Sequence, residues 1–145
     1  MTTSPGSVLL VEDNVAHAVM IRRAFKMAQL QVSLTSVENG DEAIDYLKAA
    51  KGPAAEHSLP DLVLLDWNLP GKSGLEVLSW IRREPTTKSL PVVVLTASSD
   101  EDDVRDAMLA GSDSYLVKPV AFGLLIDLVE LLDLKWLRPG ARRRD

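Results

Sequence analysis

The sequence predicts an α/β fold in which a doubly wound, five-stranded parallel sheet lies between two layers of helices. Short apolar runs alternate with segments whose apolar residues recur at the helical period. Four of the runs are continuously apolar, which is typical of strands buried on both faces. Right-handed crossovers then give an open sheet with helices on both faces. The expected strands are residues 8–11, 32–34, 62–65, 92–95 and 115–117.

Residues in and around the expected strands and helices support this succession of elements along the chain. The run at 32–34 alternates between apolar and polar residues, so we place that strand at an edge of the sheet. Residues suited to N-capping precede three of the expected helices: Asn14, Asn39, and Ser73 with Glu76 in the pattern of a capping box.

Length and composition fit one globular domain and exclude several kinds of site. The chain has 145 residues, of which 46% are hydrophobic, enough for one buried core. It contains no cysteine, which excludes disulfides, thiolate metal sites and cysteine nucleophiles. No apolar run approaches the roughly 20 residues that a membrane-spanning helix needs, and the first seven residues lack the features of a signal peptide. We therefore expect a cytoplasmic protein without membrane contact.

Charge is unevenly distributed along the chain. The formal net charge is −5, yet residues 135–145 hold five basic residues and one acidic residue, a local charge of +4. The preceding residues therefore carry −9, which repels nucleic acid, so no nucleic-acid partner is expected. We divide the chain into a disordered N-terminus at residues 1–6, one folded domain at residues 7–134, and this short basic C-terminal tail at residues 135–145.

Polar residues follow four of the five expected strands. They are Glu12 and Asp13 after the first strand, Asp66 after the third, Thr96 after the fourth and Lys118 after the fifth. Ligand sites in open α/β sheets lie beyond the carboxyl ends of the strands, so we expect these side chains to converge. Three carboxylates at one edge repel one another and call for a cation. Oxygen ligands without His or Cys favour Mg²⁺, which also binds phosphate oxygens.

The chemistry expected at this edge is therefore phosphate chemistry. A carboxylate can itself be the nucleophile and form an acyl phosphate. Lys118 supplies a positive charge and Thr96 a hydroxyl group, and both suit phosphoryl oxygens. Each residue alone is common after a strand, but the ordered set at four strand ends favours a functional site.

Over about residues 7–134 the chain resembles the receiver domains of bacterial response regulators. The resemblance is carried by the motifs VLLVEDN, LVLLDWNLPGKSG, VVVLTAS and YLVKP. It implies a CheY-like, flavodoxin-like fold, in which the five strands lie in the order 2-1-3-4-5. It also implies that Asp66 accepts a phosphoryl group from the phosphohistidine of a sensor histidine kinase, in a Mg²⁺-dependent reaction. Asp13, Asp66 and the backbone carbonyl of Asn68 would hold the metal, with Glu12 assisting, and Lys118 would pair with the phosphoryl group.

The resemblance also implies a conformational switch. Thr96 would move toward the phosphoryl oxygens, and Tyr115 would turn inward to fill the space that it leaves. Asn68 and Ser98 occupy the positions that tune hydrolysis of the aspartyl phosphate in such domains. The peptide bond before Pro119 is expected to be cis.

Further features indicate the partners. The long loop before the third strand, the NLPGKSG turn and the tail at residues 136–139 resemble single-domain regulators paired with bacterial phytochrome kinases, which implies a bacteriophytochrome as the kinase. In receivers the first helix belongs to the kinase-docking face. We therefore expect Asn14, His17 and Met20 at partner contacts, with His17 at a surface position. Trp67 is expected to be a partly exposed cover over the loop beside Asp66.

The expected last helix, residues 122–134, is apolar around most of its circumference. One face covers the sheet and the remainder needs another cover, so we predict a homodimer through this helix. The alternative is that Trp136 and Leu137 fold back over it within one chain. The only charged residues of the helix are spaced by three: Asp127, Glu130 and Asp133.

The leading expectation is a single-domain response regulator that signals by protein contact. It would not be an enzyme beyond catalysing its own phosphorylation and dephosphorylation, and it could instead be a phosphorelay intermediate or a phosphate sink. A small phosphotransfer enzyme of the haloacid-dehalogenase kind would need an Asp where Asn68 stands. A flavodoxin-like cofactor binder would need a phosphate-cradling loop where Glu12 and Asp13 stand.

Overall fold

The structure is a computed structural model of the whole chain. It describes residues 6–50, 55, 57–96, 101–118 and 122–138. Several predictions concern residues outside these ranges: disorder at residues 1–5, the role of Ser98, the cis bond before Pro119, and the tail beyond Arg138. Gly6, which was included in the predicted disordered N-terminus, is instead the first residue of a strand.

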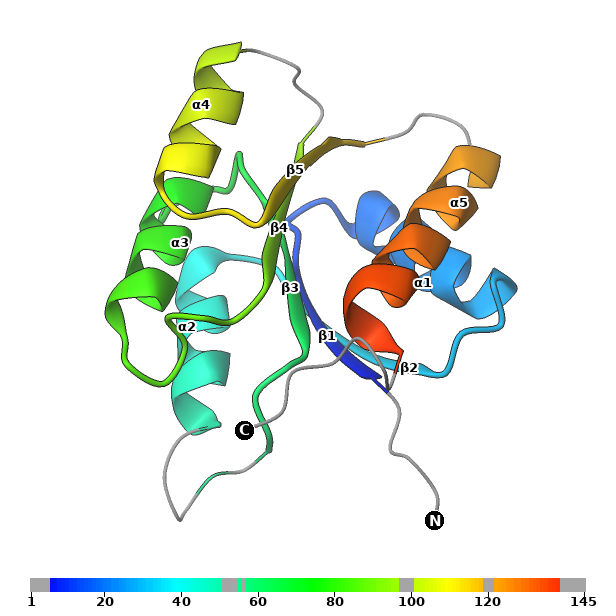
Figure 1. Cartoon of the computed structure of the whole chain (residues 1–145), viewed down its shortest axis with the longest axis horizontal. Helices are drawn as coiled ribbons and strands as arrows, with labels where there is room; N and C mark the ends of the chain where they lie inside the picture. The colour runs from blue at the N-terminus through cyan, green and yellow to red at the C-terminus, as the bar shows by residue number, and fades with distance from the viewer. Residues whose placement is uncertain (1–5, 51–54, 56, 97–100, 119–121, 139–145) are drawn as a thin grey trace.

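Five parallel strands form one sheet in the predicted order, β2-β1-β3-β4-β5. Each pair of neighbouring strands is parallel, and β2 and β5 are the edges (Figure 1). In the edge strand β2, Ser33 and Ser36 are exposed and the other residues are half-buried, so the predicted alternation holds over residues 32–34. The strands are β1 (Gly6–Val11), β2 (Val32–Val37), β3 (Leu62–Asp66), β4 (Val92–Thr96) and β5 (Ser114–Val117).

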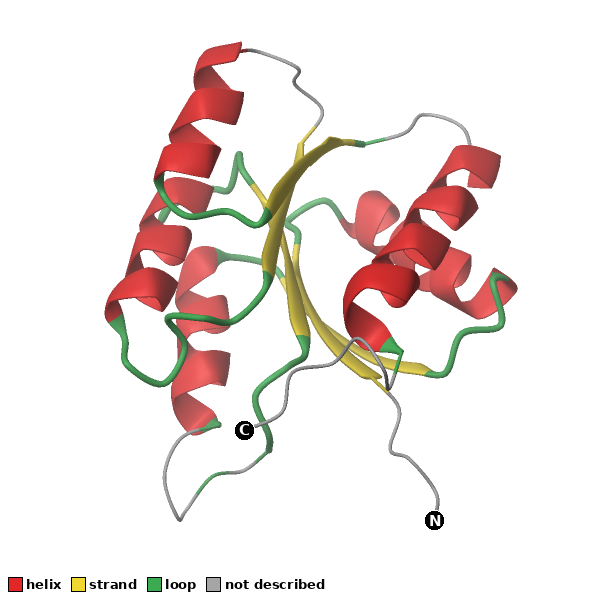
Figure 2. Ribbon diagram, viewed as in Figure 1, coloured by secondary structure: helices red, strands yellow, loops and turns green. Residues whose placement is uncertain are grey.

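Helices cover both faces of the sheet. In Figure 2, α1 and α5 lie on one side, and α2, α3 and α4 lie on the other. This arrangement confirms the doubly wound α/β fold. The helices are α1 (Val15–Met27), α2 (Gly40–Ala49), α3 (Gly74–Arg83), α4 (Glu101–Leu109) and α5 (Phe122–Leu132).

The predicted N-caps are present. The side chains of Asn14 and Asn39 each accept a hydrogen bond from the backbone N–H three residues later, at 3.1 and 2.8 Å. Ser73 and Glu76 form the reciprocal capping box, with both bonds at 3.2 Å. These bonds satisfy backbone donors that have no partner within the helix. They fix where each helix begins after the loop that follows a strand.

The core is divided by the sheet into two layers. Along β1, Val8 and Leu10 face the α1 and α5 layer, whereas Leu9 and Val11 face the other three helices. The same alternation holds in β3 and β4, so both faces of the central strands are buried. This double burial explains why these strands are continuously apolar.

The chain after α5 differs from the prediction. The helix ends at Leu132 and continues as a short π-helical segment, η1 (Asp133–Leu137). Asp133, one of the three charged residues of the expected last helix, is buried, with its carboxylate 3.1 Å from the guanidinium of Arg138. Leu137 is 1% exposed and half-buried Trp136 packs against the same core layer. The packed fold therefore extends beyond the predicted domain end at 134.

Part of the cover for α5 thus comes from its own chain, which was the alternative to a dimer. Exposed leucines nevertheless remain on α5 and just after it: Leu124, Leu131 and Leu134. The homodimer through this helix stays a prediction. Among the described residues, none of the helices is both long and apolar enough to span a bilayer.

Candidate functional site

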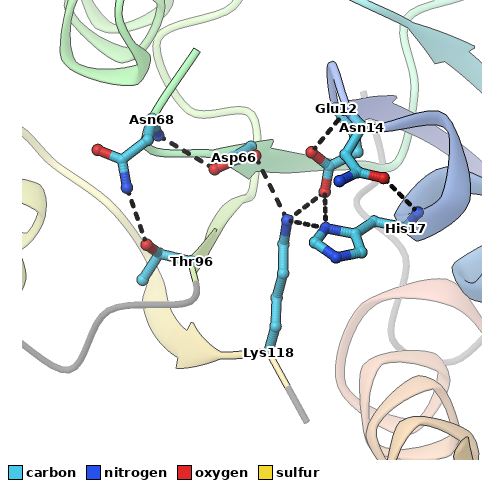
Figure 3. A network of polar contacts seen from close by, with 7 residues as sticks. All are labelled: Glu12, Asn14, His17, Asp66, Asn68, Thr96 and Lys118. Carbon is cyan, nitrogen blue, oxygen red and sulfur yellow. Dashed lines mark hydrogen bonds and ion pairs between the residues drawn. The ribbon is translucent and has the colours of Figure 1, made fainter. Parts of the chain in front are cut away.

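The residues predicted for the site meet at the carboxyl ends of four strands, as Figure 3 shows for most of them. Asp66 is the last residue of β3 and Thr96 the last of β4, while Glu12 and Lys118 directly follow β1 and β5. The parallel pairing continues into the site, because the N–H of Lys118 donates to the carbonyl of Thr96 at 2.7 Å. The N–H of Glu12 likewise donates to Val37 of β2 at 3.0 Å. The sheet backbone therefore holds these positions.

Three carboxylates converge at this edge. Glu12, Asp13 and Asp66 each offer an oxygen, and these oxygens all lie within 4.8 Å of one another. Glu12 is 2% exposed and Asp66 8% exposed, whereas Asp13 is open to solvent. Concentrated negative charge of this kind is unfavourable unless a cation shares it.

Lys118 supplies the only side-chain cation that contacts these carboxylates within the described residues. Its Nζ forms an ion pair with Glu12 and lies 3.3 Å from Oδ2 of Asp66. With all four groups ionised, the cluster with Asp13 has a formal charge of −2. One lysine thus leaves room for a divalent cation, and the hard oxygen ligands suit Mg²⁺ or Mn²⁺.

Burial makes Glu12 an unusual carboxyl group. Its pKa is raised from the ordinary 4.5 to about 7, mainly by desolvation on burial and also by the neighbouring Asp66, while Lys118 acts in the opposite direction. Near neutral pH the carboxyl group of Glu12 is therefore partly protonated, and the degree of protonation depends on the charges around it. A bound cation would favour its ionised form.

Close packing of α3 fixes the position of Asp66. A Cβ atom on Gly74, the first residue of α3, would lie 2.8 Å from the carbonyl oxygen of Asp66 and from Cα of Trp67. Only glycine lets the helix start so close to the end of β3. The prediction for Trp67 was wrong: its side chain is 7% exposed and belongs to the core layer under α2, α3 and α4.

A second set of contacts joins Asp66 to β4. The backbone N–H of Asn68 donates to Oδ1 of Asp66 at 3.0 Å, and its side-chain amide donates to the hydroxyl of Thr96 at 3.3 Å. Thr96 is fully buried. Tyr115 of β5 is half-buried against the core layer that holds Trp67. The expected switch residues therefore lie on neighbouring strands beside the phosphoacceptor candidate.

One site residue was missed by the sequence pattern. His17 was predicted at a surface position and at kinase contacts, not at the phosphate site, and its side chain is indeed 43% exposed. Its Nδ1 nevertheless lies 3.2 Å from Nζ of Lys118 (Figure 3). The available signal was its place in the first turn of α1, three residues after the cap Asn14, at the same sheet edge as Glu12.

His17 and Lys118 also border a cavity between α1 and α5. Its volume is about 150 Å³, and Met20 is among its lining residues. Two of the three residues expected at kinase contacts therefore lie at one hollow beside the site. Asn14, the third, caps α1 through its side chain. Their role in partner binding stays a prediction.

The sequence profile of the response regulator receiver domain matches residues 8–130. The chain belongs to this family. Receiver domains are mostly signalling modules, which favours that function over a phosphotransfer enzyme or a flavodoxin-like cofactor binder.

Several relatives cover nearly the whole chain. It is 44% identical over 133 residues to the probable methanogenesis regulatory protein FilR2 of Methanothrix harundinacea, which spans 92% of this chain and 84% of that protein. It is 35% identical to the response regulator Rcp1 of a Synechocystis strain, over 92% of this chain and 90% of Rcp1. A crystal structure of Mn²⁺-bound Rcp1 superposes with a TM-score of 0.82 at 34% identity, covering 97% of this chain and 100% of that one.

A third relative is known in its phosphorylated form. The crystal structure of the phosphorylated cyanobacterial phytochrome response regulator RcpA has a TM-score of 0.81 and 37% identity, over 91% of this chain and 94% of that one. This receiver is thus similar to phytochrome response regulators in both sequence and fold.

Proposed function

We propose that this receiver accepts a phosphoryl group on Asp66 from the phosphohistidine of a sensor histidine kinase, in a reaction that needs Mg²⁺. The observation that carries the proposal is the cluster of three carboxylates with a single lysine between two of them. Asp66 is the carboxylate best suited to accept the group. It is the last residue of the central strand β3, and it is contacted both by Lys118 and by the N–H of Asn68.

The metal would be held by Asp13, Asp66 and the backbone carbonyl of Asn68, with Glu12 assisting. When bound, Mg²⁺ would neutralise excess charge and bind phosphoryl oxygens. The acidic cluster supports this assignment, and so does the Mn²⁺ bound by the relative Rcp1.

In the transfer itself, a carboxylate oxygen of Asp66 attacks phosphorus and forms an acyl phosphate bond. The bond between phosphorus and the kinase imidazole breaks, and that ring leaves with its electron pair. Lys118 lies beside Asp66 and would stabilise the negative charge of the phosphoryl oxygens. The protein would thus assist its own phosphorylation and later hydrolysis, without turning over another substrate.

A change at Thr96 and Tyr115 would carry the signal. The hydroxyl of Thr96 accepts from Asn68, so a phosphoryl group on Asp66 would offer Thr96 a new acceptor close to its present contact. Half-buried Tyr115 could then move into the space that Thr96 leaves. Such a switch shifts a two-state equilibrium and changes the face offered to a partner.

The proposed kinase is a bacteriophytochrome. This proposal rests on the similarity to RcpA and Rcp1, since RcpA is described as a phytochrome response regulator. Contacts with the kinase would involve α1, where His17 and Met20 line the hollow beside Lys118. A relay intermediate or a phosphate sink would use the same chemistry and differ only in the next acceptor.

Incubation with acetyl phosphate tests the chemistry. Intact mass should show one phosphoryl adduct on the wild type with Mg²⁺, and none on Asp66→Ala or with EDTA. Asp45→Ala, an exposed acidic change on α2, is a control that should still take up the group. An adduct that persists in Asp66→Ala would place the acceptor elsewhere and contradict the proposal.

A further inference from the structure

The side chain of His17 makes a contact that a docking residue on α1 would not need. Its Nδ1 lies 3.2 Å from Nζ of Lys118, and 3.7 Å from Oε1 of Glu12. Figure 3 shows the ring turned toward the lysine head, on the side away from Asn68 and Thr96. The backbone N–H of His17 is bonded to the cap Asn14, so the start of α1 holds this residue at the sheet edge.

The three contacts of Nζ match the donors of an ammonium group. Lys118 carries three N–H donors and no acceptor, and its described partners are Glu12, Asp66 and Nδ1 of His17. Nδ1 can accept a hydrogen bond from the lysine only when it carries no proton, which is the tautomer with its proton on Nε2. In that tautomer His17 is a neutral acceptor for a cation that is otherwise held by two anions.

The two anions are also the groups that a metal would engage. Glu12 and Asp66 belong to the acidic cluster, and a divalent cation there competes with Lys118 for their oxygens. His17 is the one described partner of the lysine that lies outside this cluster. A ring nitrogen on that side would keep the ammonium group beside Asp66 once the carboxylates turn to the metal.

We propose that His17 is a positioning residue of this receiver, whose unprotonated Nδ1 holds the ammonium group of Lys118 ready for the phosphoryl oxygens in the metal-loaded site. The inference rests on the proposed function of Asp66. It deepens that function, because it adds a residue from α1 to a site otherwise built from strand ends.

Three substitutions at His17 separate acceptor chemistry from packing. The amide of Asn places its polar atoms near the position of Nδ1, whereas the longer Gln reaches the position of Nε2, and Ala offers neither. We would follow phosphorylation by acetyl phosphate by intact mass at saturating Mg²⁺. His17→Ala and His17→Gln should slow it about five- to tenfold, the effect of losing one hydrogen bond of typical net strength. His17→Asn should stay within about twofold of the wild type, because its amide oxygen can accept from Lys118.

Two further measurements accompany the rates. Titration of Mg²⁺ against tryptophan fluorescence should give the same midpoint for all variants, since His17 is not expected to bind the metal. Val19→Ala, an exposed change on the same helix, should leave the rate unchanged. Urea unfolding of each variant would show whether a slower rate comes with a less stable fold.

The possible outcomes separate the role of His17 from the proposed function of Asp66. Equal rates for wild type, Ala, Gln and Asn would overturn the role of His17 while Asp66 remained the acceptor. Equal slowing in all three variants would also overturn it, because packing rather than Nδ1 would then be responsible. A wild type that takes up no group on Asp66, from acetyl phosphate or from a kinase, would overturn the proposed function and this inference with it.

Discussion

The two ends of the sheet differ in how their carboxylates are paired. At the amino end, Ser7 and Asp61 form reciprocal bonds, with the N–H of Ser7 2.8 Å from the Asp61 carboxylate. Arg138 likewise pairs with the buried Asp133. At the carboxyl end, three carboxylates crowd within 4.8 Å and share contacts with one lysine. Local pairing closes the fold at one end, while the other end keeps an excess of charge.

This difference shows which end is built for ligand chemistry. A buried carboxylate without a full partner destabilises the fold, so an excess of such groups indicates a function. Both ends use a glycine at a close approach, but for different purposes. Gly6 lets the carbonyl of Leu137 close over β1, whereas Gly74 lets α3 start against Asp66. Substitutions of single residues at each end test this difference.

Lys118→Met should have the largest effect. It removes a charged donor from both Glu12 and Asp66, and we expect phosphorylation by acetyl phosphate to slow about 100-fold. The affinity for Mg²⁺ should rise, because a competing cation is gone. Lys72→Met is a matched control, since Lys72 pairs with Asp41 at 2.8 Å on the open surface. A normal phosphorylation rate in Lys118→Met would show that the lysine serves only the fold.

The pH dependence of stability should reveal Glu12. Its pKa in the fold, about 7, lies above the ordinary 4.5, so the folded state binds more protons between these values. The stability of the metal-free protein relative to Glu12→Gln should therefore be highest below pH 4.5 and fall as pH rises through 7. The decrease should reach up to about 3 kcal/mol.

Urea unfolding of the two proteins across this range measures the difference. Added Mg²⁺ should reduce the decrease, because the metal favours the ionised form. A constant difference between wild type and Glu12→Gln from pH 4 to 8 would contradict the raised pKa. An opposite slope would contradict it as well.

Gly74→Ala should destabilise the fold by about 2 kcal/mol, because a new methyl group must displace the backbone at Asp66 and Trp67. Gly123→Ala is the control. That residue is helical, with no neighbouring atom within 4 Å of an added Cβ, so the change should stabilise by up to about 1 kcal/mol. Equal effects of the two changes on urea unfolding would show that α3 does not press on the site.

At the amino end, Arg138→Ala should have the smallest effect. Its guanidinium is half exposed, and its pair with Asp133 should contribute about 1 kcal/mol or less to stability. Phosphorylation and Mg²⁺ affinity should stay at wild-type values. A change in either would mean that the two ends are coupled, and would weaken the distinction drawn between them.

Much of the fold follows from short-range patterns. Continuous apolar runs indicate strands covered on both faces, and capping residues such as Asn14 and Asn39 indicate where helices begin. The carboxyl ends of parallel strands lie at one edge of the sheet. The convergence of Glu12, Asp66 and Lys118 could therefore be predicted from the sequence alone. None of these inferences depends on the rotation of a helix about its axis.

The features that the sequence did not predict depend on how the helices rotate and pack. The contact of His17 with Lys118 requires a particular rotation of α1 and a particular side-chain rotamer. The burial of Trp67 depends on how closely α3 approaches the end of β3. Asp133 enters the interior because the chain changes its helical pitch after Leu132. Residue spacing alone carries little information on these long-range contacts.

The most direct test of the central claim is to find which residue carries the phosphoryl group. Borohydride reduces an aspartyl phosphate to homoserine, so peptide sequencing by mass spectrometry after treatment with Mg²⁺, acetyl phosphate and borohydride marks the acceptor. We predict homoserine at position 66, and none there when EDTA replaces Mg²⁺. Homoserine at position 13 instead, or the same labelling of position 66 without the metal, would contradict the account.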